Sequence, residues 1–376
     1  MLTERQIELF NNLMALVESN EAFFYVDQTL GNTTYRIFNY RLASYTDFLE
    51  ADALECRGTT FALKNDGSPW YLASWPFEKF FNLHENPFTM EIDLTDPLSI
   101  QYKMDGSLIS SFEDENGELR LKSKGSLFSQ QAEDAFNLLS QGSYEYLHEF
   151  VRNWTKSGFT VIMEYMAPDN RIVIGVNEPS LTVLGVRGNA NGKYVGYEHI
   201  REDILKKYFV HEIVNEVEDV NAFVESIKDM QGIEGFVIET KTGQRVKVKT
   251  DWYASLHHLK DSINSERRLF EAVIYETVDD LRANFYDDEQ AMALINDMEQ
   301  RVEHIYNHMA DSVEKFYQAN KHLDRKDYAI KGKEELDHLH FPLAMQLYSG
   351  YDVDYKTHML KNRKKLGIKD EPVEEG

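Results

Sequence analysis

The chain has 376 residues, enough for two domains of ordinary size, and hydrophobic residues make up 42% of it. Its net charge of -24 argues against a protein that coats nucleic acid, because such binding depends on neutralising phosphates with lysine and arginine. The charge still allows an enzyme that gathers a few basic residues in one cleft. No stretch approaches the ~20 apolar residues of a membrane span, and the start shows no signal-peptide block, so we expect a soluble, cytoplasmic protein.

The chain contains a single cysteine, Cys56. It therefore has no internal disulfide and no zinc site built on several cysteines. A nucleophilic thiol would need a histidine or another feature that lowers its pKa, and the sequence around Cys56 offers neither. We interpret Cys56 as an inert, buried residue.

The first part of the chain, to about residue 254, has the pattern of a mixed α and β domain. Ile7, Phe10, Leu13 and Val17 follow helical spacing and predict a helix over 7–18. Further short helices are expected over 129–139 and 144–154. Glycine-containing turns separate pairs of apolar runs, which predicts antiparallel hairpins. The predicted strand pairs are 61–63 with 70–73, 108–112 with 119–121, and 236–238 with 246–248.

The periodicity changes after about residue 255, where strand signals disappear. Apolar residues recur there at steps of three and four, which is the pattern of an amphipathic helix. They are Ile295, Met298, Val302, Ile305, Met309, Val313 and Phe316. Segments 266–284 and 340–350 look similar, and the polar end, 369–376, is expected to fray. We therefore predict an α+β fold, with an antiparallel-sheet domain over residues 1–254 and an all-helical domain over residues 255–376.

The strongest chemical signal is Lys103-Met104-Asp105-Gly106-Ser107, which follows a predicted strand, 99–102, and opens a hairpin. A lysine in such a turn can act as a nucleophile only when its amine is neutral, which requires nearby cations or burial to lower its pKa. The motif alone is equally typical of a surface turn with a solvated lysine. Its meaning depends on the rest of the chain.

Two more lysines, Lys247 and Lys249, alternate with Val246 and Val248 and so share one face of a strand. Like charges this close repel unless an anion lies between them, and a phosphate is the obvious candidate. The alternative is an exposed edge strand whose lysines prevent aggregation.

Two carboxylates stand out. Glu164 interrupts an apolar strand, 161–166, and Glu234 lies between two glycines at the entrance of another strand. A buried carboxylate without a partner is costly, so Glu164 should meet a cation, a metal or a hydroxyl. Either residue taken alone could be an ordinary surface glutamate.

These motifs, in the order in which they follow one another along the chain, resemble those of the covalent nucleotidyltransferases, which are the polynucleotide ligases and mRNA capping enzymes. The order is Lys103-x-Asp-Gly-Ser, Glu164, Glu234-Gly and Lys247-x-Lys249. The resemblance is strongest to the RNA ligase 1 family of T-even bacteriophages and runs from about residue 6 to about residue 350. Other segments that carry it are Tyr35–Tyr40, Glu55–Gly58, Pro76–Leu83, Lys122–Ser126, Ala167–Val173 and Asp251–Tyr253. The tail after about residue 350 departs from the family pattern, which leaves its part in RNA recognition open.

The resemblance implies a role for each matching position. Lys103 would attack the α-phosphate of ATP, Lys247 and Lys249 would hold that phosphate, and Tyr253 would be needed for ligation. The catalytic residues expected from the family are Lys103, Glu164, Lys247, Lys249 and Tyr253. The expected nucleotide-binding residues are Tyr40, Arg57, Lys79, Lys103, Lys124, Glu164, Glu234, Lys247 and Lys249. The expected metal ligands, for Mg²⁺, are Asp279 and Glu234.

The function implied is an ATP-dependent RNA ligase that works through a lysyl-AMP enzyme. AMP would pass from Lys103 to a 5′-phosphate RNA end, and a 3′-hydroxyl would then displace it. The resemblance implies single-stranded RNA, from cleaved tRNA in a phage-infected cell, as the substrate. We expect the enzyme to be a monomer.

Two alternatives come from the same scaffold. A DNA ligase or a GTP-using capping enzyme usually has a β-barrel after the second lysine pair, whereas a helical region is predicted here. A catalytically inactive RNA-binding homologue would typically have lost some charged positions, and this chain has all of them.

Other candidate sites are weaker. The histidine pairs His257-His258 and His338-x-His340 could bind a metal, but packing or surface roles are more common. The basic run 361–365 could contact RNA or could be a solvated helix end. No P-loop motif occurs in the sequence, which disfavours a P-loop kinase or ATPase.

Overall fold

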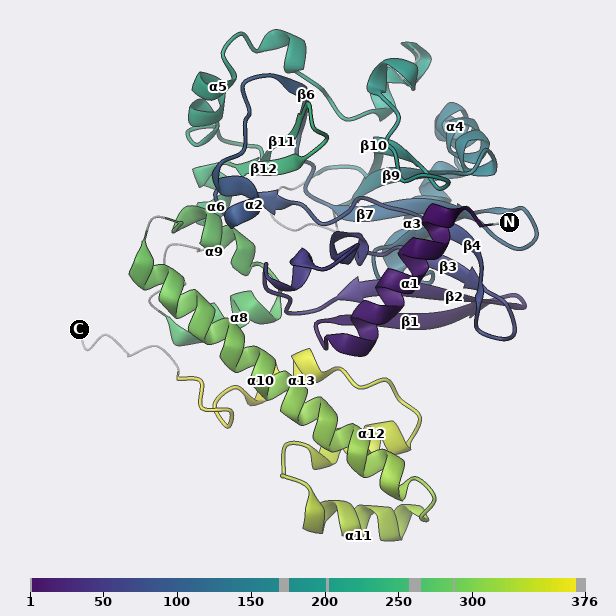
Figure 1. The fold of residues 1–376 in the computed structure, drawn as a ribbon, viewed down its shortest axis with the longest axis vertical. Coiled ribbons are helices and arrows are strands. Elements are labelled where there is room, and N and C mark those ends of the chain that lie inside the picture. Colours follow the sequence, from purple (N-terminus) through teal and green to yellow (C-terminus); the bar gives the residue numbers. More distant parts are fainter. Residues whose placement is uncertain (1, 169–175, 201–202, 257–264, 287, 370–376) are drawn as a thin grey trace. The chain divides into compact units, whose positions relative to one another are not determined.

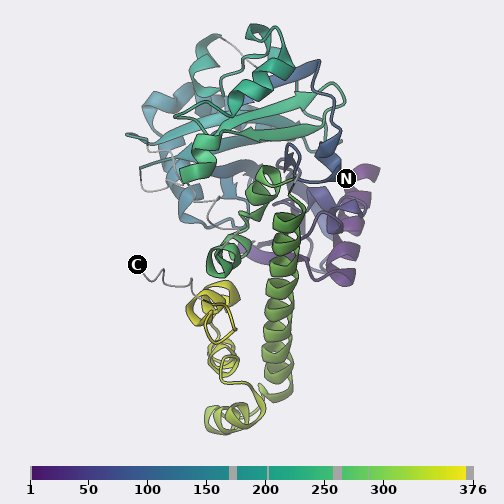
Figure 2. The ribbon, with the colours of Figure 1, turned by 90° about the vertical axis from the view of Figure 1, so that its left-hand side faces the viewer.

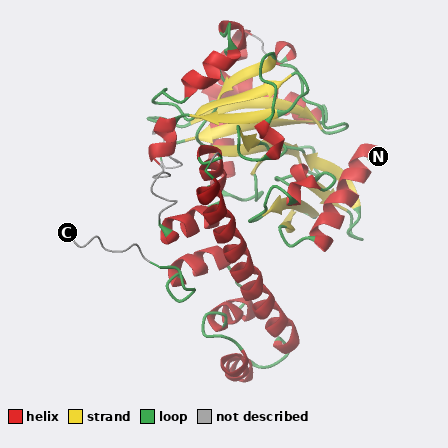
Figure 3. Cartoon of the chain, turned by 60° about the vertical axis from the view of Figure 1, so that its left-hand side comes forward, coloured by secondary structure: helices red, strands yellow, loops and turns green. Residues whose placement is uncertain are grey.

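The computed structural model describes residues 2–168, 176–200, 203–256, 265–286 and 288–369. By contacts, the chain divides into two compact units, residues 1–257 and 258–376. Figure 3 shows the strands gathered in the first unit, whereas the described part of the second unit is built from helices. The predicted α+β fold is confirmed.

Three four-stranded sheets make up the first unit. The first, in the order β1-β2-β3-β4, comprises Phe23–Leu30, Thr33–Tyr40, Thr60–Leu63 and Pro69–Ser74. The second, in the order β10-β9-β7-β8, comprises Ser180–Gly188, Phe159–Met166, Ser107–Glu113 and Leu119–Ser123. The third, in the order β5-β12-β11-β6, comprises Phe81–Asn82, Arg245–Lys249, Gly235–Thr240 and Pro97–Tyr102. All pairings are antiparallel except β5 with β12.

The three hairpins predicted from turn sequences are confirmed as β3–β4, β7–β8 and β11–β12. Each turn contains a glycine with positive φ, at Gly67, Gly117 and Gly243. Glycine adopts this left-handed conformation without a steric penalty, and for this reason these short turns can be predicted from the sequence.

The first helix, α1 (Glu4–Ser19), lies across the β1–β4 sheet (Figure 1). It begins with a capping box, in which Thr3 and Gln6 satisfy each other's free backbone N–H groups. Its buried face differs from the predicted one. Leu9 and Leu13 are fully buried, whereas Ile7 is 45% exposed, because the sheet contacts a face turned slightly from the predicted stripe.

Helices α3 (Gln130–Leu139) and α4 (Glu145–Lys156) cover the β10-β9-β7-β8 sheet. Ala135, Leu139, Leu147 and Val151 pack there against strand residues in one continuous apolar core. The short helix α5 (Val220–Ile227) covers the third sheet in the same way. Two further short helices in this unit are α2 (Pro87–Met90) and α6 (Asp251–Leu256).

In the second unit, α10 (Glu289–Asn320) is the long helix, and Figure 2 shows shorter helices along it. The predicted apolar stripe is its buried face, except that Tyr306 takes the place expected for Ile305. The other described helices here are α8 (Glu266–Ile274), α9 (Val278–Asn284), α11 (Arg325–Glu335), α12 (Phe341–Tyr348) and α13 (Tyr355–Asn362). Residues 370–376 of the predicted frayed end lie outside the described residues. No helix of the described chain is both long and apolar enough to cross a membrane.

Candidate active site

Lys103 is the first residue after β6, and its backbone is fixed to the neighbouring strand. Its N–H donates to the carbonyl oxygen of Gly235 at 2.9 Å, which places the lysine beside the start of β11. A Cβ at Gly235 would lie 2.0 Å from the carbonyl oxygen of Val248, and one at Gly106 would lie 2.3 Å from that of Tyr165. The glycines that follow Lys103 and Glu234 are therefore required by the close approach of neighbouring strands.

Glu234 is the anionic centre of the site. Its Oε1 lies 2.8 Å from Nζ of Lys103 and 3.2 Å from Nζ of Lys249. The residue is only 2% exposed, and its second oxygen, Oε2, has no hydrogen-bond partner among the described residues. A buried carboxylate oxygen left in this state is costly unless a ligand completes it. The site therefore has an acceptor ready for a metal ion or a donor group of a substrate.

Lys247 and Lys249 share one face of β12, as predicted, while Val246 and Val248 are buried on the other. The anion expected near the pair is partly supplied by the protein itself, since Glu234 contacts Lys249. Nζ of Lys249 also lies 5.2 Å from the ring centroid of Tyr253. The predicted pairing of these lysines with a phosphate stays a prediction.

Glu164 lies in β9 and is buried, and its Oε1 accepts a hydrogen bond from the N–H of Gly106 at 3.0 Å. The pKa of Glu164 is raised to about 7, mainly by burial and also by the charge of Glu234, while Lys103 and Arg57 act to lower it. The partner shown for this carboxylate is a backbone N–H, while Lys103 and Arg57 act on it through their charges, so the expected contact with a cation, a metal or a hydroxyl stays a prediction. Its protonation state is poised near neutral pH, as is common for groups in active sites.

Tyr253, in α6, is joined to the lysine motif itself. Its phenol donates a hydrogen bond to Oδ1 of Asp105 at 2.9 Å, and both side chains are buried. The sequence pointed to Asp105 only as a member of the motif around Lys103. Its bond to Tyr253 was not predicted, because the partners are 148 positions apart and neither spacing nor periodicity connects them.

Tyr40, Lys79 and Lys124 form a second basic group. Nζ of Lys79 lies 5.5 Å from the ring centroid of Tyr40, and Nζ of Lys124 lies 5.1 Å from it. An aromatic ring stabilises nearby ammonium groups through its quadrupole, so Tyr40 holds the two cations near each other. The arrangement suits a polyanion such as a triphosphate tail.

Arg57 lies just after the 3-10 turn Ala53–Glu55 and donates to the carbonyl oxygen of Phe77 at 3.3 Å. Its charge also acts on Glu164, so Arg57 belongs to the group around Lys103. The structure thus brings together five of the predicted site residues from separate strands and loops. They are Arg57, Lys103, Glu164, Glu234 and Lys249.

Asp279, the other predicted metal ligand, is in the first turn of α9 in the second unit. Within the described ranges, no group of three or more histidine, cysteine, aspartate or glutamate side chains is arranged to hold a metal. A magnesium role for Asp279 stays a prediction.

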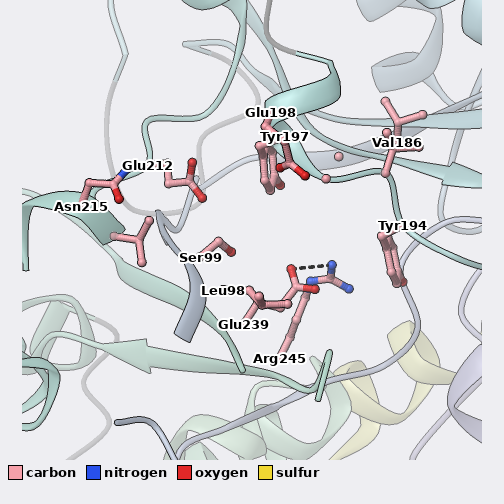
Figure 4. Close-up of a pocket in the computed structure, with 14 residues that line it drawn as sticks. Leu98, Ser99, Val186, Tyr194, Tyr197, Glu198, Glu212, Asn215, Glu239 and Arg245 are labelled. Carbon is pink, nitrogen blue, oxygen red and sulfur yellow. Dashed lines mark hydrogen bonds and ion pairs between the residues drawn. The ribbon is translucent and has the colours of Figure 1, made fainter. Parts of the chain in front are cut away.

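A cavity of ≈ 510 Å³ opens on the third sheet at the other end of β6 from Lys103 (Figure 4). Ser99, Glu239 and Arg245 line it from three adjacent strands. Glu239 accepts a hydrogen bond from Nη2 of Arg245 at 2.8 Å, and the guanidinium lies 3.8 Å from the ring centroid of Tyr194. By strand alternation Arg245 shares its face with the active-site lysines, so the cavity continues the same side of the sheet.

The surroundings of Cys56 and His340 show what these two weaker candidates contact in the structure. Cys56 is buried, and burial raises the pKa of its thiol, which confirms the inert interpretation. His340 lies against His308, with ring centroids 5.4 Å apart, and packs within the second unit. The pair His257-His258 lies outside the described residues.

Comparison with known proteins gives the family. A family model described as "RNA ligase" matches residues 55–253, and another, described as "T4 RNA ligase 1, C-terminal domain", matches residues 260–369. The chain belongs to this RNA ligase family. It is an ATP-dependent RNA ligase, and most of its second unit matches the C-terminal domain of T4 RNA ligase 1.

The relatives found by sequence are also named as RNA ligases. RNA ligase 1 of bacteriophage TS2126 is 28% identical over 61% of this chain and 58% of its own length. The RNA ligase of Rhodothermus phage RM378 is 22% identical over 78% of this chain and 81% of its own, and a Thermovibrio ammonificans protein provisionally named an RNA ligase is 26% identical over 83% of each. Among solved structures, an archaeal ATP-dependent RNA ligase has a TM-score of 0.49 at 15% identity, covering 96% of this chain and 98% of its own.

An ATP-dependent RNA ligase works with a divalent metal ion, and the residues present fit one. Glu234 offers the orphaned Oε2, and its charge acts on the nearby carboxyl group of Glu164. Magnesium is typically held by one or two carboxylates together with substrate phosphates and water, so a cluster of three protein ligands is not required. Such an ion would neutralise the charge of the phosphates in the site.

Proposed function

We propose that Lys103 carries AMP as a covalent intermediate while the enzyme joins a 5′-phosphate end to a 3′-hydroxyl end of single-stranded RNA. The carrying observation is that Glu234 pairs with both Lys103 and Lys249 in a buried site that also includes Glu164 and Arg57. Phosphoryl-type transfer depends mainly on positioning and charge neutralisation, and this group provides both.

In the first step, the neutral amine of Lys103 attacks the α-phosphorus of ATP. A P–N bond forms, the bond to the bridging oxygen breaks, and pyrophosphate leaves. Lys247 and Lys249 bind the α-phosphate, while Lys79 and Lys124 bind the departing phosphates beside Tyr40. When ATP enters, its phosphates replace Glu234 as the partner of Lys249, which the shared oxygen allows.

The later steps reuse the same centre. The 5′-phosphate of RNA attacks the phosphorus of lysyl-AMP and releases Lys103, and the 3′-hydroxyl then attacks the 5′-phosphate and releases AMP. Each step displaces a group at a phosphorus held by the same cations. Arg57 and Glu164 hold the ribose side of the nucleotide throughout, and Tyr253 positions the turn that carries Lys103 through Asp105.

The metal is Mg²⁺ in this proposal, held by Glu234 with the phosphates, and the substrate is cleaved tRNA in a phage-infected cell. The second unit supplies the preference for that RNA. Its support is that this region matches the C-terminal domain model of T4 RNA ligase 1 and that two relatives are phage enzymes.

The test is to incubate the protein with Mg²⁺ and α-³²P-ATP or α-³²P-GTP, and then to add 5′-phosphorylated single-stranded RNA. We expect label on the protein from ATP alone, chased into adenylated and then joined RNA. Lys103→Ala and Lys103→Arg should both take no label, since alanine has no amine and arginine stays protonated. Label retained by either variant contradicts the mechanism.

Two other results would point elsewhere. Label from GTP would indicate a capping-type enzyme, and no label with intact RNA binding would indicate an inactive homologue. Replacing Mg²⁺ with EDTA in the same assay tests whether labelling requires a divalent metal ion. Comparing a cleaved tRNA anticodon stem with an unstructured RNA of equal length tests the proposed substrate.

A further inference from the structure

Lys122, in β8, is a lysine with no exposed surface. Its Nζ donates hydrogen bonds to the carbonyl oxygen of Gly58 at 3.0 Å and to that of Ser123 at 2.8 Å. Lysine is almost never fully buried without a charged partner, because removing an ammonium from water is costly. Both of its hydrogen-bond partners are neutral carbonyls, so an ion pair does not account for its burial.

Its contacts join two segments that carry proposed nucleotide-binding residues. Gly58 directly follows Arg57, and Ser123 directly precedes Lys124. One amine therefore fixes the carbonyl after the proposed ribose-binding arginine and the carbonyl before the proposed phosphate-binding lysine. The spacing between these two backbones depends on the position of Nζ.

The backbones at Gly58 and Ser123, which Lys122 joins, also contact a third segment, the end of β2. We call this meeting point of three segments the junction. The side chain of Asn39 donates to the carbonyl oxygen of Lys124 at 3.3 Å, and the next residue is Tyr40. Gly58 adopts a φ of 91° and donates to the carbonyl oxygen of Phe38 at 2.7 Å. A Cβ on Gly58 would lie 2.8 Å from the carbonyl oxygen of Lys124, so the segments are in direct backbone contact.

The chemistry of the amine suits a geometric role. Burial lowers the pKa of Lys122 to about 7, so its charged and neutral forms are both present near neutral pH. A neutral amine still has two N–H groups, which is the number that Gly58 and Ser123 require. The two hydrogen bonds can persist in either form.

We propose that Lys122 is a positioning residue of the nucleotide site, which sets the spacing of Arg57 and Lys124, and with them Tyr40, for binding ATP. This role rests on the proposed function. Lys122 does not touch the nucleotide itself. Removing its amine should therefore weaken ATP binding and leave the attack by Lys103 largely intact.

The test is Lys122→Met, which keeps an unbranched apolar chain as far as Cε and removes the amine that donates both hydrogen bonds. Single-turnover labelling from α-³²P-ATP is measured over a range of ATP concentrations. We expect the half-saturating ATP concentration to rise by about tenfold or more, with a limiting rate within about threefold of wild type. The matched control is Thr155→Val, which also removes a buried hydrogen bond, from Thr155 to Ser111 at 2.7 Å, in the same unit.

A different result is expected if Lys122 only stabilises the fold and has no effect on the nucleotide site. Lys122→Met would then lower the melting temperature and the labelled fraction, as in the control, without moving the half-saturating concentration, and that outcome overturns the proposal. If Lys122→Met does not fold, Asn39→Leu decides, because it breaks the same junction at Lys124 and should raise the half-saturating concentration too. Wild-type protein that takes no label would instead overturn the proposed function.

Discussion

The phenol of Tyr253 donates a hydrogen bond to the buried carboxylate of Asp105 at 2.9 Å, although 148 positions separate them in the chain. Asp105 lies in the turn that starts with Lys103, and Tyr253 lies in α6, after the last strand of the third sheet. The bond therefore connects the turn that starts with Lys103 to the end of the first unit.

Tyr253→Phe should destabilise the protein by about 1–3 kcal/mol, because it leaves a buried carboxylate without this donor. We also expect slower labelling of Lys103, since the turn loses its support. Thermal unfolding and single-turnover labelling measure the two effects. Tyr328→Phe is the control, because Tyr328 is fully buried in the second unit and donates to the carbonyl oxygen of Ala344 at 3.1 Å. Equal labelling defects in both variants would argue against a specific role for Tyr253.

Glu234→Gln should reduce labelling from ATP by at least about tenfold. Glutamine keeps the size of the side chain but removes the charge that pairs with Lys103 and Lys249. Glu239→Gln is matched to it, because that carboxylate also pairs with a cation on β12, Arg245, but at the distant cavity. Titrating Mg²⁺ in both variants tests whether Glu234 holds the metal: only Glu234→Gln should need more Mg²⁺.

Glu164 makes stability depend on pH. Its pKa is raised from 4.5 to about 7, so between these values the folded state holds a proton that the unfolded state has lost. The free energy of unfolding should therefore fall as pH rises from 4.5 to about 7, by roughly 3 kcal/mol at most, and change little above that range. Denaturant unfolding of wild type and Glu164→Gln at several pH values measures this, with the difference between the two curves as the result. Parallel curves would rule out a buried, neutral Glu164.

The histidines of the second unit predict the opposite trend. Burial lowers the pKa of His340 and of His358 from 6.5, and His308 and His338 add positive charge around His340 while Asp337 opposes them. The unfolded chain therefore takes up protons first as pH falls below 6.5, and stability is lost. Thermal unfolding followed by helical circular dichroism at pH 7.5 and 5.5 should show this loss. His340→Gln should reduce it, and an unchanged difference would contradict the assignment.

Much of the architecture could be predicted from the sequence, because turn residues and apolar spacing determine the hairpins and helices locally. Turn glycines marked the hairpins, and apolar spacing marked α10. The position of Lys103 after β6 follows from the same rules. Ile7 shows the limit, since its exposure depends on how α1 lies on a sheet whose position the helix pattern does not contain.

The site was less predictable where it depends on distant partners. Burial of Glu164 follows from its apolar neighbours, whereas the ion pairs of Glu234 require knowing that β6 and β11 are adjacent. Lys122 belongs to a segment that carries the family resemblance, but nothing in the sequence assigned it a role of its own. Alternation along β8 places it on the face opposite Leu121, but only the tertiary structure shows that this face is also covered.

The register of β6 against β11 has a consequence for protein synthesis. Lys103 leaves the ribosome long before Glu234 and Tyr253 have been made, yet Glu234 pairs with its amine and Tyr253 holds Asp105 of the same turn. A nascent or prematurely terminated chain thus contains the proposed nucleophile without the residues that hold it in place. Under the proposed mechanism, the enzyme should therefore consume ATP only once its whole first unit is complete.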